Sequence, residues 1–215
     1  MQRLRVRFSR GPELKFISHL DLMRLWQRAL HRAGVALAYS EGYTPHPRIS
    51  LAAPLALGVT SDAELMDVYC TKWVSPHVFS SVVGKELPLG IEVLQVNNVA
   101  LPLPSLQAQV RYAEYRVQVK TPQAAPAVAE AISGLLALEH LPWQHQRDTG
   151  PRNYDLRPLI EDLSLRECQD GCCTIGMRLR CSSQGSGRPE QVIAALGFTG
   201  HPASIHRTRL LLKTS

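Results

Sequence analysis

Two short segments near the start of the chain gather residue types that carry acid–base chemistry or bind anions. Residues 16–22 form one segment and residues 40–48 the other. Together they contribute two imidazoles, two carboxylates, a phenol and a guanidinium: His19, Asp21, Glu41, Tyr43, His46 and Arg48. Two histidines can cleave RNA when one imidazole removes the 2′-hydroxyl proton and the other protonates the leaving oxygen. His19 and His46, with Asp21 and Glu41 nearby in sequence, are therefore the candidate catalytic residues.

Part of this pattern also has a structural interpretation. Ser18 is typical of a helix N-cap, and Asp21 three residues later is typical of a capping box, so capping and packing are favoured for Asp21 and His19. A helix N-terminus also presents free N–H groups that suit a phosphate. His46 lies between two prolines, which stiffen the backbone around it. So much constraint around a polar side chain favours a functional role for the second segment.

The sequence contains no complete metal or cofactor signature. Neither His-x-x-x-His nor Cys-x-x-Cys occurs. In the run Cys168-x-x-x-Cys172-Cys173 the last two cysteines are adjacent, unlike those of a radical-SAM cluster loop. A P-loop and a Gly-x-Gly-x-x-Gly fingerprint are also missing. We expect no metal and no cofactor, and five cysteines in a chain without a secretion signal predict reduced thiols.

Positive charge is concentrated at the start of the chain. The formal net charge is +6, and residues 1–48 alone hold nine Lys/Arg against three acids. This concentration indicates an anionic partner. Arg157 and Arg188 each precede a proline, which favours extended backbone and makes them phosphate contacts or members of internal ion pairs. The candidate RNA-contacting residues are Arg3, Arg5, Arg7, Arg24, Arg28, Arg32, Tyr43, His46, Arg48, Arg157 and Arg188.

Local patterns predict the elements that must position these residues. Residues 3–10 alternate as a half-buried strand. The capping signals predict a helix that begins after Ser18 and ends near Gly34, with an apolar stripe on one face and arginines on another. The pattern then predicts a broad hairpin over 35–74, a helix over 76–83 and a strand over 91–96.

The order strand, helix, two strands, helix, strand is that of the ferredoxin-like, split βαβ arrangement. It recurs in the second half, with strands predicted at 115–120, 160–168, 174–181 and 204–213 and helices at 125–138 and 189–196. The sequence therefore predicts an α+β protein of two tandem ferredoxin-like units, 1–100 and 113–215, joined by a linker at 101–112. Residues 144–159 are expected to be a loop long enough to suggest a function.

The composition indicates the cellular compartment in which the protein acts. Apolar runs stay well short of the ~18 residues that a membrane-spanning helix needs, and the alternating N-terminus does not resemble a signal peptide. We expect a soluble, cytoplasmic protein with no membrane partner.

Four motifs stand out: residues 16–21 (FISHLD), 39–47 (YSEGYTPHP), 54–58 (PLALG) and 154–158 (YDLRP). Together they resemble a bacterial family of radical-SAM-linked proteins, a domain of unknown function, and the resemblance covers essentially the whole chain. In that family the domain is often fused to a radical-SAM module or encoded beside one. The present sequence has no such module, so the resemblance implies a stand-alone member with a radical-SAM protein as partner. It implies no reaction.

The tandem order is also similar to that of RNA-binding and RNA-cleaving CRISPR processing proteins, although their glycine-rich C-terminal loop is missing here. These observations favour a non-catalytic RNA-binding accessory module that presents structured, tRNA-like RNA to a radical-SAM partner. A small RNA hydrolase or modification enzyme using His19 and His46 is one alternative. A protein–protein docking subunit of a radical-SAM enzyme, without RNA, is the other. Since the arginines lie on both a strand and a helix, the sequence leaves open whether they form one patch.

Overall fold

The computed structural model describes residues 1–147, 150–182 and 184–213. The chain divides into two compact units, which are Met1–Val110 with the chain end from Lys213, and Arg111–Leu212. We refer to them as unit 1 and unit 2. The fold is mixed α+β, and all the strand pairings with a defined register are antiparallel within the described residues.

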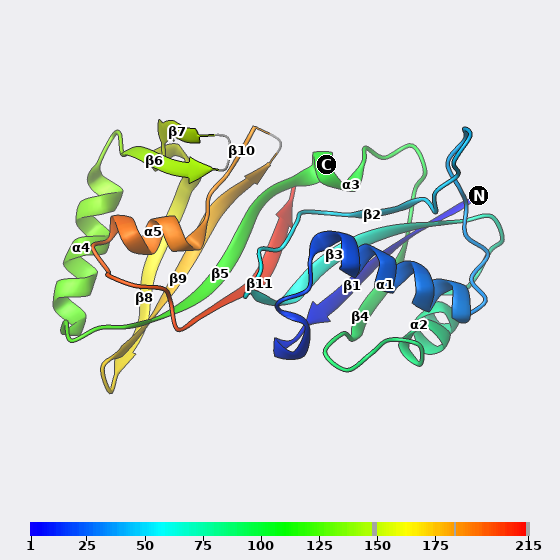
Figure 1. Cartoon of the computed structure of the whole chain (residues 1–215), viewed down its shortest axis with the longest axis horizontal. Coiled ribbons are helices and arrows are strands. Elements are labelled where there is room, and N and C mark those ends of the chain that lie inside the picture. Colours follow the sequence, from blue (N-terminus) through cyan, green and yellow to red (C-terminus); the bar gives the residue numbers. More distant parts are fainter. Residues whose placement is uncertain (148–149, 183, 214–215) are drawn as a thin grey trace. The chain divides into compact units, whose positions relative to one another are not determined.

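Unit 1 contains a four-stranded sheet and the helices that cover it (Figure 1). Its elements are β1 (Gln2–Arg10), η1 (Pro12–Leu14), α1 (His19–Arg32), β2 (Ile49–Leu51), β3 (Thr60–Cys70), α2 (Pro76–Gly84), β4 (Val93–Val99) and α3 (Leu106–Gln109). The strand order is β2-β3-β1-β4. Every helix and strand expected between residues 3 and 96 is present, with ends shifted by a few residues.

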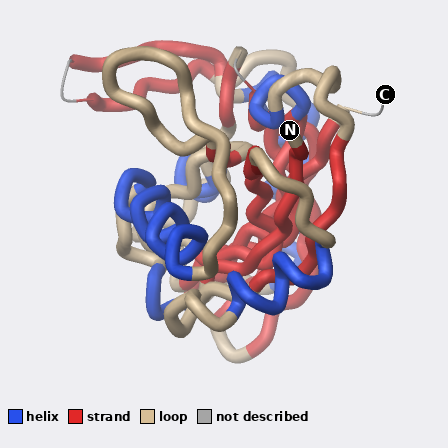
Figure 2. Tube along the Cα trace, turned by 90° about the vertical axis from the view of Figure 1, so that its right-hand side faces the viewer, coloured by secondary structure: helices blue, strands red, loops and turns tan. Residues whose placement is uncertain are grey.

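The core of unit 1 lies between one face of this sheet and helices α1 and α2 (Figure 2). Alternate residues of β1, including Leu4 and Phe8, are fully buried, as are Trp26 on α1 and Phe79 on α2. The rings of Phe8 and Trp26 meet edge to face with centroids 4.8 Å apart. Burial of each large apolar side chain contributes roughly 1.5–3 kcal/mol, so this contact fixes α1 against β1.

Local hydrogen bonds set the start and end of α1. The Ser18 hydroxyl accepts a hydrogen bond from the Asp21 amide at 3.1 Å and donates one to the Asp21 carboxylate at 2.7 Å. The buried Arg10 donates to the carbonyls of Lys15 and Ile17, each at 2.9 Å, and so holds the turn that precedes the helix. Gly34 follows the helix with φ +69°, which a residue with a Cβ rarely adopts.

Unit 2 contains four main sheet strands, one short strand and a separate two-stranded hairpin. Its elements are β5 (Val110–Lys120), α4 (Ala125–Ala137), β6 (Pro142–Arg147), β7 (Gly150–Asp155), η2 (Arg157–Leu159), β8 (Ile160–Gln169), β9 (Cys172–Ser182), β10 (Gly185–Ser186), α5 (Pro189–Ala195) and β11 (Ser204–Leu212). The sheet runs β8-β9-β5-β11, and the short β10 pairs with the end of β9.

Two expectations from the sequence were wrong. Residues 144–159 are not a loop, because most of them belong to the antiparallel pair β6–β7 and to η2. The segment 101–112, expected as the linker, contains α3 and the start of β5. Cys168 and Cys173, which face each other across β8 and β9, form a disulfide rather than two free thiols.

Membrane-spanning helices and metal clusters are both missing from the described residues. No helix in the described ranges is long and apolar enough to cross a membrane. Among the same residues, no group of three or more His, Cys, Asp or Glu side chains is placed to hold a metal ion.

Candidate nucleic-acid interface

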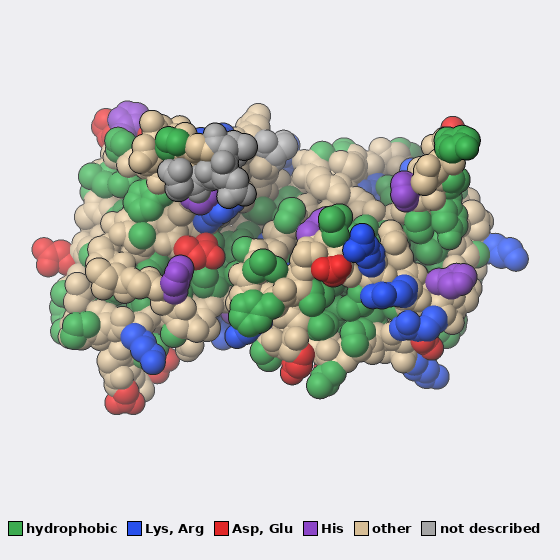
Figure 3. All heavy atoms as spheres, in the orientation of Figure 1, with side chains coloured by type: hydrophobic (Ala, Val, Ile, Leu, Met, Phe, Trp, Pro, Cys, Tyr) green, Lys and Arg blue, Asp and Glu red, His purple; other side chains and the backbone are tan. Residues whose placement is uncertain are grey.

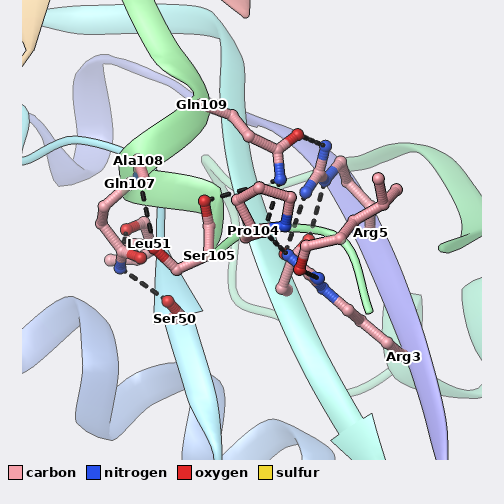
Figure 4. A network of polar contacts seen from close by, with 11 residues as sticks. Arg3, Arg5, Ser50, Leu51, Pro104, Ser105, Gln107, Ala108 and Gln109 are labelled. Atoms are coloured by element: carbon pink, nitrogen blue, oxygen red, sulfur yellow. Dashed lines mark hydrogen bonds and ion pairs between the residues drawn. The ribbon is translucent and has the colours of Figure 1, made fainter. Parts of the chain in front are cut away.

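The first arginine of β1 is not available to a partner. Arg3 and Asp67 form an ion pair at 2.6 Å in which neither side chain is exposed. Arg3 also donates to the carbonyls of Leu103 and Pro104, both at 2.8 Å (Figure 4). The prediction that Arg3 contacts RNA was therefore wrong, since the chain after β4 covers this guanidinium and a carboxylate neutralises it.

Arg5 belongs to the same network. Its Nε lies 2.8 Å from Asp67, its Nη1 donates to Gln109 at 3.2 Å, and its side chain is only 14% exposed. Gln107 donates to the Ser50 hydroxyl at 2.6 Å and so attaches the chain segment after β4 to β2 (Figure 4). Arg5, like Arg3, therefore holds residues 103–109 in place and does not bind a partner.

Arg7 is the exposed arginine of this strand. Its Nε donates to the carbonyl of Asp62 at 3.2 Å. Because Arg7 is exposed, unlike Arg3 and Arg5, it remains a candidate RNA contact.

Residues 40–48, the second candidate segment, form an exposed turn between α1 and β2 (Figure 1). The Ser40 amide donates to the His46 carbonyl at 2.8 Å, and the His46 amide donates to the Ser40 hydroxyl at 3.0 Å. Glu41 and Tyr43 are exposed beyond this closure, Tyr43 completely. Arg48 stacks on the ring of Tyr69 at 4.5 Å from its centroid. The backbone is constrained as the sequence predicted, and the polar side chains point to solvent.

The two candidate catalytic histidines lie at opposite ends of β1. Ile17 lies two residues before His19, and its carbonyl accepts a hydrogen bond from the side chain of Arg10 at the C-terminal end of β1. The turn that carries His46 is tied through Ala38 to Tyr69, which pairs with Arg3 at the other end. At about 3.3 Å per residue these ends are roughly 23 Å apart. The structure thus does not bring the imidazoles together, and the acid–base pair inferred from the sequence was wrong.

Asp21 is accounted for by the helix cap. The hydrogen bond from the Ser18 hydroxyl, with a smaller contribution from Arg24, lowers the pKa of Asp21 below its ordinary value. An exposed carboxylate held ionised in this way suits a cap and a favourable helix dipole, not a proton donor.

The outward face of α1 carries four basic side chains, and they are Arg24, Arg28, His31 and Arg32. Arg24 has only a long, exposed contact with Asp21 at 3.4 Å, and Arg32 pairs with Glu86 at 2.8 Å. Arg28 forms no ion pair with any residue that the model describes. Lys and Arg side chains follow the course of α1 across the surface (Figure 3).

A groove of about 570 Å³ borders this face. Its apolar lining includes Leu14, Leu25 and Leu87, and its charged lining comprises three cations and one carboxylate, which are Arg28, Arg32, Lys85 and Glu86. We call Arg24, Arg28, Arg32 and Lys85 together the basic face. Lys85 was not among the residues predicted from the sequence, although its position two residues after the expected helix 76–83 is typical of an exposed cation.

The two arginines of unit 2 that precede prolines have different surroundings. Arg157 donates to the carbonyls of Leu136, Leu138 and Ile160 at 2.8–3.0 Å. It therefore closes the C-terminal end of α4, and the predictions of a phosphate contact or an internal ion pair were wrong for this residue. Arg188 is exposed, with Nη1 3.3 Å from the imidazole of His145.

Asp155 explains the rest of the 154–158 motif. Its carboxylate accepts hydrogen bonds from the amides of Leu141 and Arg157 at 2.8 and 3.0 Å and lies 2.7 Å from Nδ1 of His140. These contacts, that of His140 foremost, lower the pKa of Asp155. The motif is thus a local fastening of hairpin β6–β7 to the end of α4.

Comparison with known proteins gives a family and a set of similar folds. A family model described as an uncharacterized protein conserved in bacteria, DUF2344, matches residues 3–189. No curated protein matches the sequence. A crystal structure of a Cbf5-Nop10-Gar1 complex aligns with 96% of this chain and 48% of its own, at TM-score 0.56 and 9% identity.

Two further solved structures behave in the same way. An archaeal box H/ACA sRNP Nop10-Cbf5 complex aligns at TM-score 0.51 and 11% identity. An H/ACA RNP bound to a substrate RNA containing 2′-deoxyuridine aligns at TM-score 0.53 and 10% identity. In both, 96% of this chain aligns with 47% of the other. The chain thus spans about half the length of these proteins, and at such identities the likeness concerns the fold.

Proposed function

The chain belongs to the DUF2344 family of uncharacterized bacterial proteins, and from that premise we propose that it binds structured, tRNA-like RNA through the basic face of unit 1. The observation that carries this proposal is the placement of Arg24, Arg28, Arg32 and Lys85 on one exposed surface beside a groove. The binding role needs no catalytic group in this chain.

The spacing of the helix cations suits a polyanion. Arg24, Arg28 and Arg32 follow each other at four-residue intervals, so successive side chains lie on the same face about 6 Å apart along the axis. Helix-dipole compensation accounts for basic residues in the last turn only. Arg24 and Arg28 precede that turn, and Arg28 has no intramolecular partner among the described residues. An external anion gives these charges a role.

The exposed aromatic rings of unit 1 are scattered along the sequence. Tyr39 and Tyr43 belong to the segment after α1, whereas Phe16 precedes α1 and Trp73 follows β3. Single-strand readout relies on several stacking platforms, whereas double-stranded RNA is read through shape and phosphate contacts. We therefore assign phosphates of a folded RNA to the basic face, with Tyr43, His46 and Arg48 as further contacts from the turn.

The comparisons support RNA as the class of partner. One solved structure of similar fold is an RNP bound to a substrate RNA. We also propose that both units are ferredoxin-like. The strand orders β2-β3-β1-β4 and β8-β9-β5-β11, each with a helix after the first strand and before the last, support this assignment.

The finer part of the proposal concerns the protein that receives the RNA. The motif resemblance to radical-SAM-linked proteins supports a radical-SAM enzyme in this role. Co-purification of the two proteins in the presence of RNA, with loss after ribonuclease treatment, is the result expected if RNA joins them. Retention after ribonuclease treatment would instead favour direct protein docking.

Arg28→Glu tests the RNA proposal. Reversal of an unpaired charge at the centre of the basic face is expected to weaken tRNA binding at least about tenfold at 50 mM salt. Lys120→Glu, an exposed strand residue of unit 2, makes the same charge change elsewhere and serves as the matched control. Equal losses in both variants, or no loss in Arg28→Glu, would remove the basic face from consideration.

A further inference from the structure

A second charged hollow lies on the sheet of unit 2. It has a volume of about 460 Å³, and its polar lining comprises Glu114, Arg116, Asp162, Arg166 and Arg178. These residues come from β5, β8 and β9. Buried side chains of β5 alternate with them and occupy the other face of the same strand. The hollow is therefore on the sheet face opposite the buried one.

An irregularity in β8 directs Arg166 into this hollow. Leu165 pairs with Ile175 and Glu167 pairs with Thr174, so Arg166 is an extra residue in a β-bulge. Bulges of this kind re-aim a side chain and are common beside functional sites. The guanidinium lies over Gly176, where a Cβ would come within 2.7 Å of the Arg166 Nε. The absence of a side chain at 176 therefore gives Arg166 its position.

The charges around the hollow do not all cancel. Arg178 donates twice to Glu114, at 2.8 and 3.0 Å, which raises the pKa of Arg178, with Asp162 a lesser contributor. Arg116 and Arg166 have no ion pair with any described residue. The polar lining thus carries three guanidiniums against two carboxylates, and two of the guanidiniums form no close ion pair.

A hydroxyl beside the same guanidinium also lacks a partner. The Ser164 oxygen is buried and makes no hydrogen bond with the described part of the chain. It lies 3.0 Å from the position that a Cβ on Gly176 would take. Buried polar atoms nearly always have a partner, and Ser164 lies next to Arg166 without lining the hollow, so its hydroxyl is available to a group bound beside Arg166.

We propose that this hollow binds the phosphate group of a nucleotide, with Arg116 and Arg166 as its phosphate ligands. Guanidinium groups make strong, charge-assisted hydrogen bonds to phosphate oxygens. The carboxylates of Glu114 and Asp162 accept hydrogen bonds from the hydroxyls of the attached sugar. The volume lies within the range of small-molecule sites. This inference does not rest on RNA binding by the basic face, because the residues belong to unit 2.

Calorimetric titration with adenosine 5′-monophosphate, in buffer free of phosphate, tests the proposal. We expect saturable binding that inorganic phosphate competes away, and at least tenfold weaker binding of adenosine. Arg166→Gln and Arg116→Gln should each weaken binding about tenfold or more. Gly176→Ala keeps every charge but displaces Arg166, so it should weaken binding as well. Thermal unfolding of each variant shows whether the fold persists.

Lys120→Gln is the matched control, since it removes an exposed cation of β5 that does not line the hollow. It should bind the nucleotide like the wild type. An octa-adenylate titration distinguishes a free nucleotide from a nucleotide within an RNA chain as the source of the phosphate. The absence of saturable binding of both probes, or equal losses in Lys120→Gln and Arg166→Gln, would overturn the proposal. The Arg28→Glu variant should retain nucleotide binding, which separates this test from that of the basic face.

Discussion

The guanidinium of Arg3 and the carboxylate of Asp67 lie 2.6 Å apart, and neither side chain is exposed to solvent. The same carboxylate also receives Arg5 at 2.8 Å. Asp67 therefore holds two arginines that, in sequence, belong to a basic N-terminus, and its charge balances one of them. Arg3 is buried and Arg5 nearly so, whereas the arginines of α1 are exposed.

Asp67→Ala is expected to reduce the free energy of unfolding by about 3–5 kcal/mol, because it leaves a buried guanidinium without a counterion. Urea denaturation measures the change. The triple variant Arg3→Met, Arg5→Met, Asp67→Leu removes all three charges of the network and should be clearly more stable than Asp67→Ala. A loss below about 1 kcal/mol in Asp67→Ala would contradict the account of this pair.

Local signals predicted the elements of unit 1 well. The Ser18 cap, the apolar stripe that includes Trp26 and the positive φ of Gly34 are determined by neighbours within a few residues, and the sequence placed all three. Strand alternation likewise placed Leu4 and the other buried residues of β1, because a period of two assigns each residue to a face.

The sequence could not predict what covers the other face of β1. Alternation assigns Arg3 and Arg5 to that face but does not show that residues 103–109 pack over it. Hairpin β6–β7 was missed because Gln144, His145 and Asn153 do not alternate with apolar residues. The two strands are held by their pairing with one another. The separation of His19 and His46 follows from hydrogen bonds that attach their segments to opposite ends of β1, and no local pattern conveys these long-range attachments.

Arg157→Ala is expected to destabilise the protein by about 2 kcal/mol, since it removes three hydrogen bonds from a charged donor to the carbonyls at the end of α4. Arg157→Lys should recover little of this loss, because an ammonium cannot reproduce the planar arrangement of donors. Urea denaturation gives the stabilities. A tRNA titration of the folded variant should give wild-type affinity, and a selective loss of affinity would restore Arg157 as an RNA contact.

The lowered pKa of Asp155 predicts a dependence of stability on pH. A carboxyl whose pKa is lower in the folded state stabilises that state above its ordinary pKa of about 3.9, and this contribution is lost as pH falls through the folded-state value. Asp155→Asn should therefore be less stable than the wild type at pH 6, and the difference should shrink below about pH 4. Thermal unfolding across this range measures it.

Glu130→Gln is the control for that series, because Glu130 is an exposed residue of α4 that forms no ion pair with any described residue. Its difference from the wild type should stay near zero at every pH. A gap between wild type and Asp155→Asn that persists unchanged to pH 2.5 would show that the ionised carboxylate does not provide the stabilisation.

The salt dependence of tRNA affinity tests the central claim most directly. The wild type should lose affinity steadily as salt rises from about 50 to about 200 mM, because phosphate contacts release counterions. The triple variant Arg24→Gln, Arg28→Gln, Lys85→Gln should give a slope of log Kd against log salt that is shallower by about 2. Arg111→Gln, Lys120→Gln, Arg209→Gln, with equal net charge, should match the wild-type slope. Wild-type affinity that ignores salt, or identical slopes in both triple variants, would contradict RNA binding through the basic face.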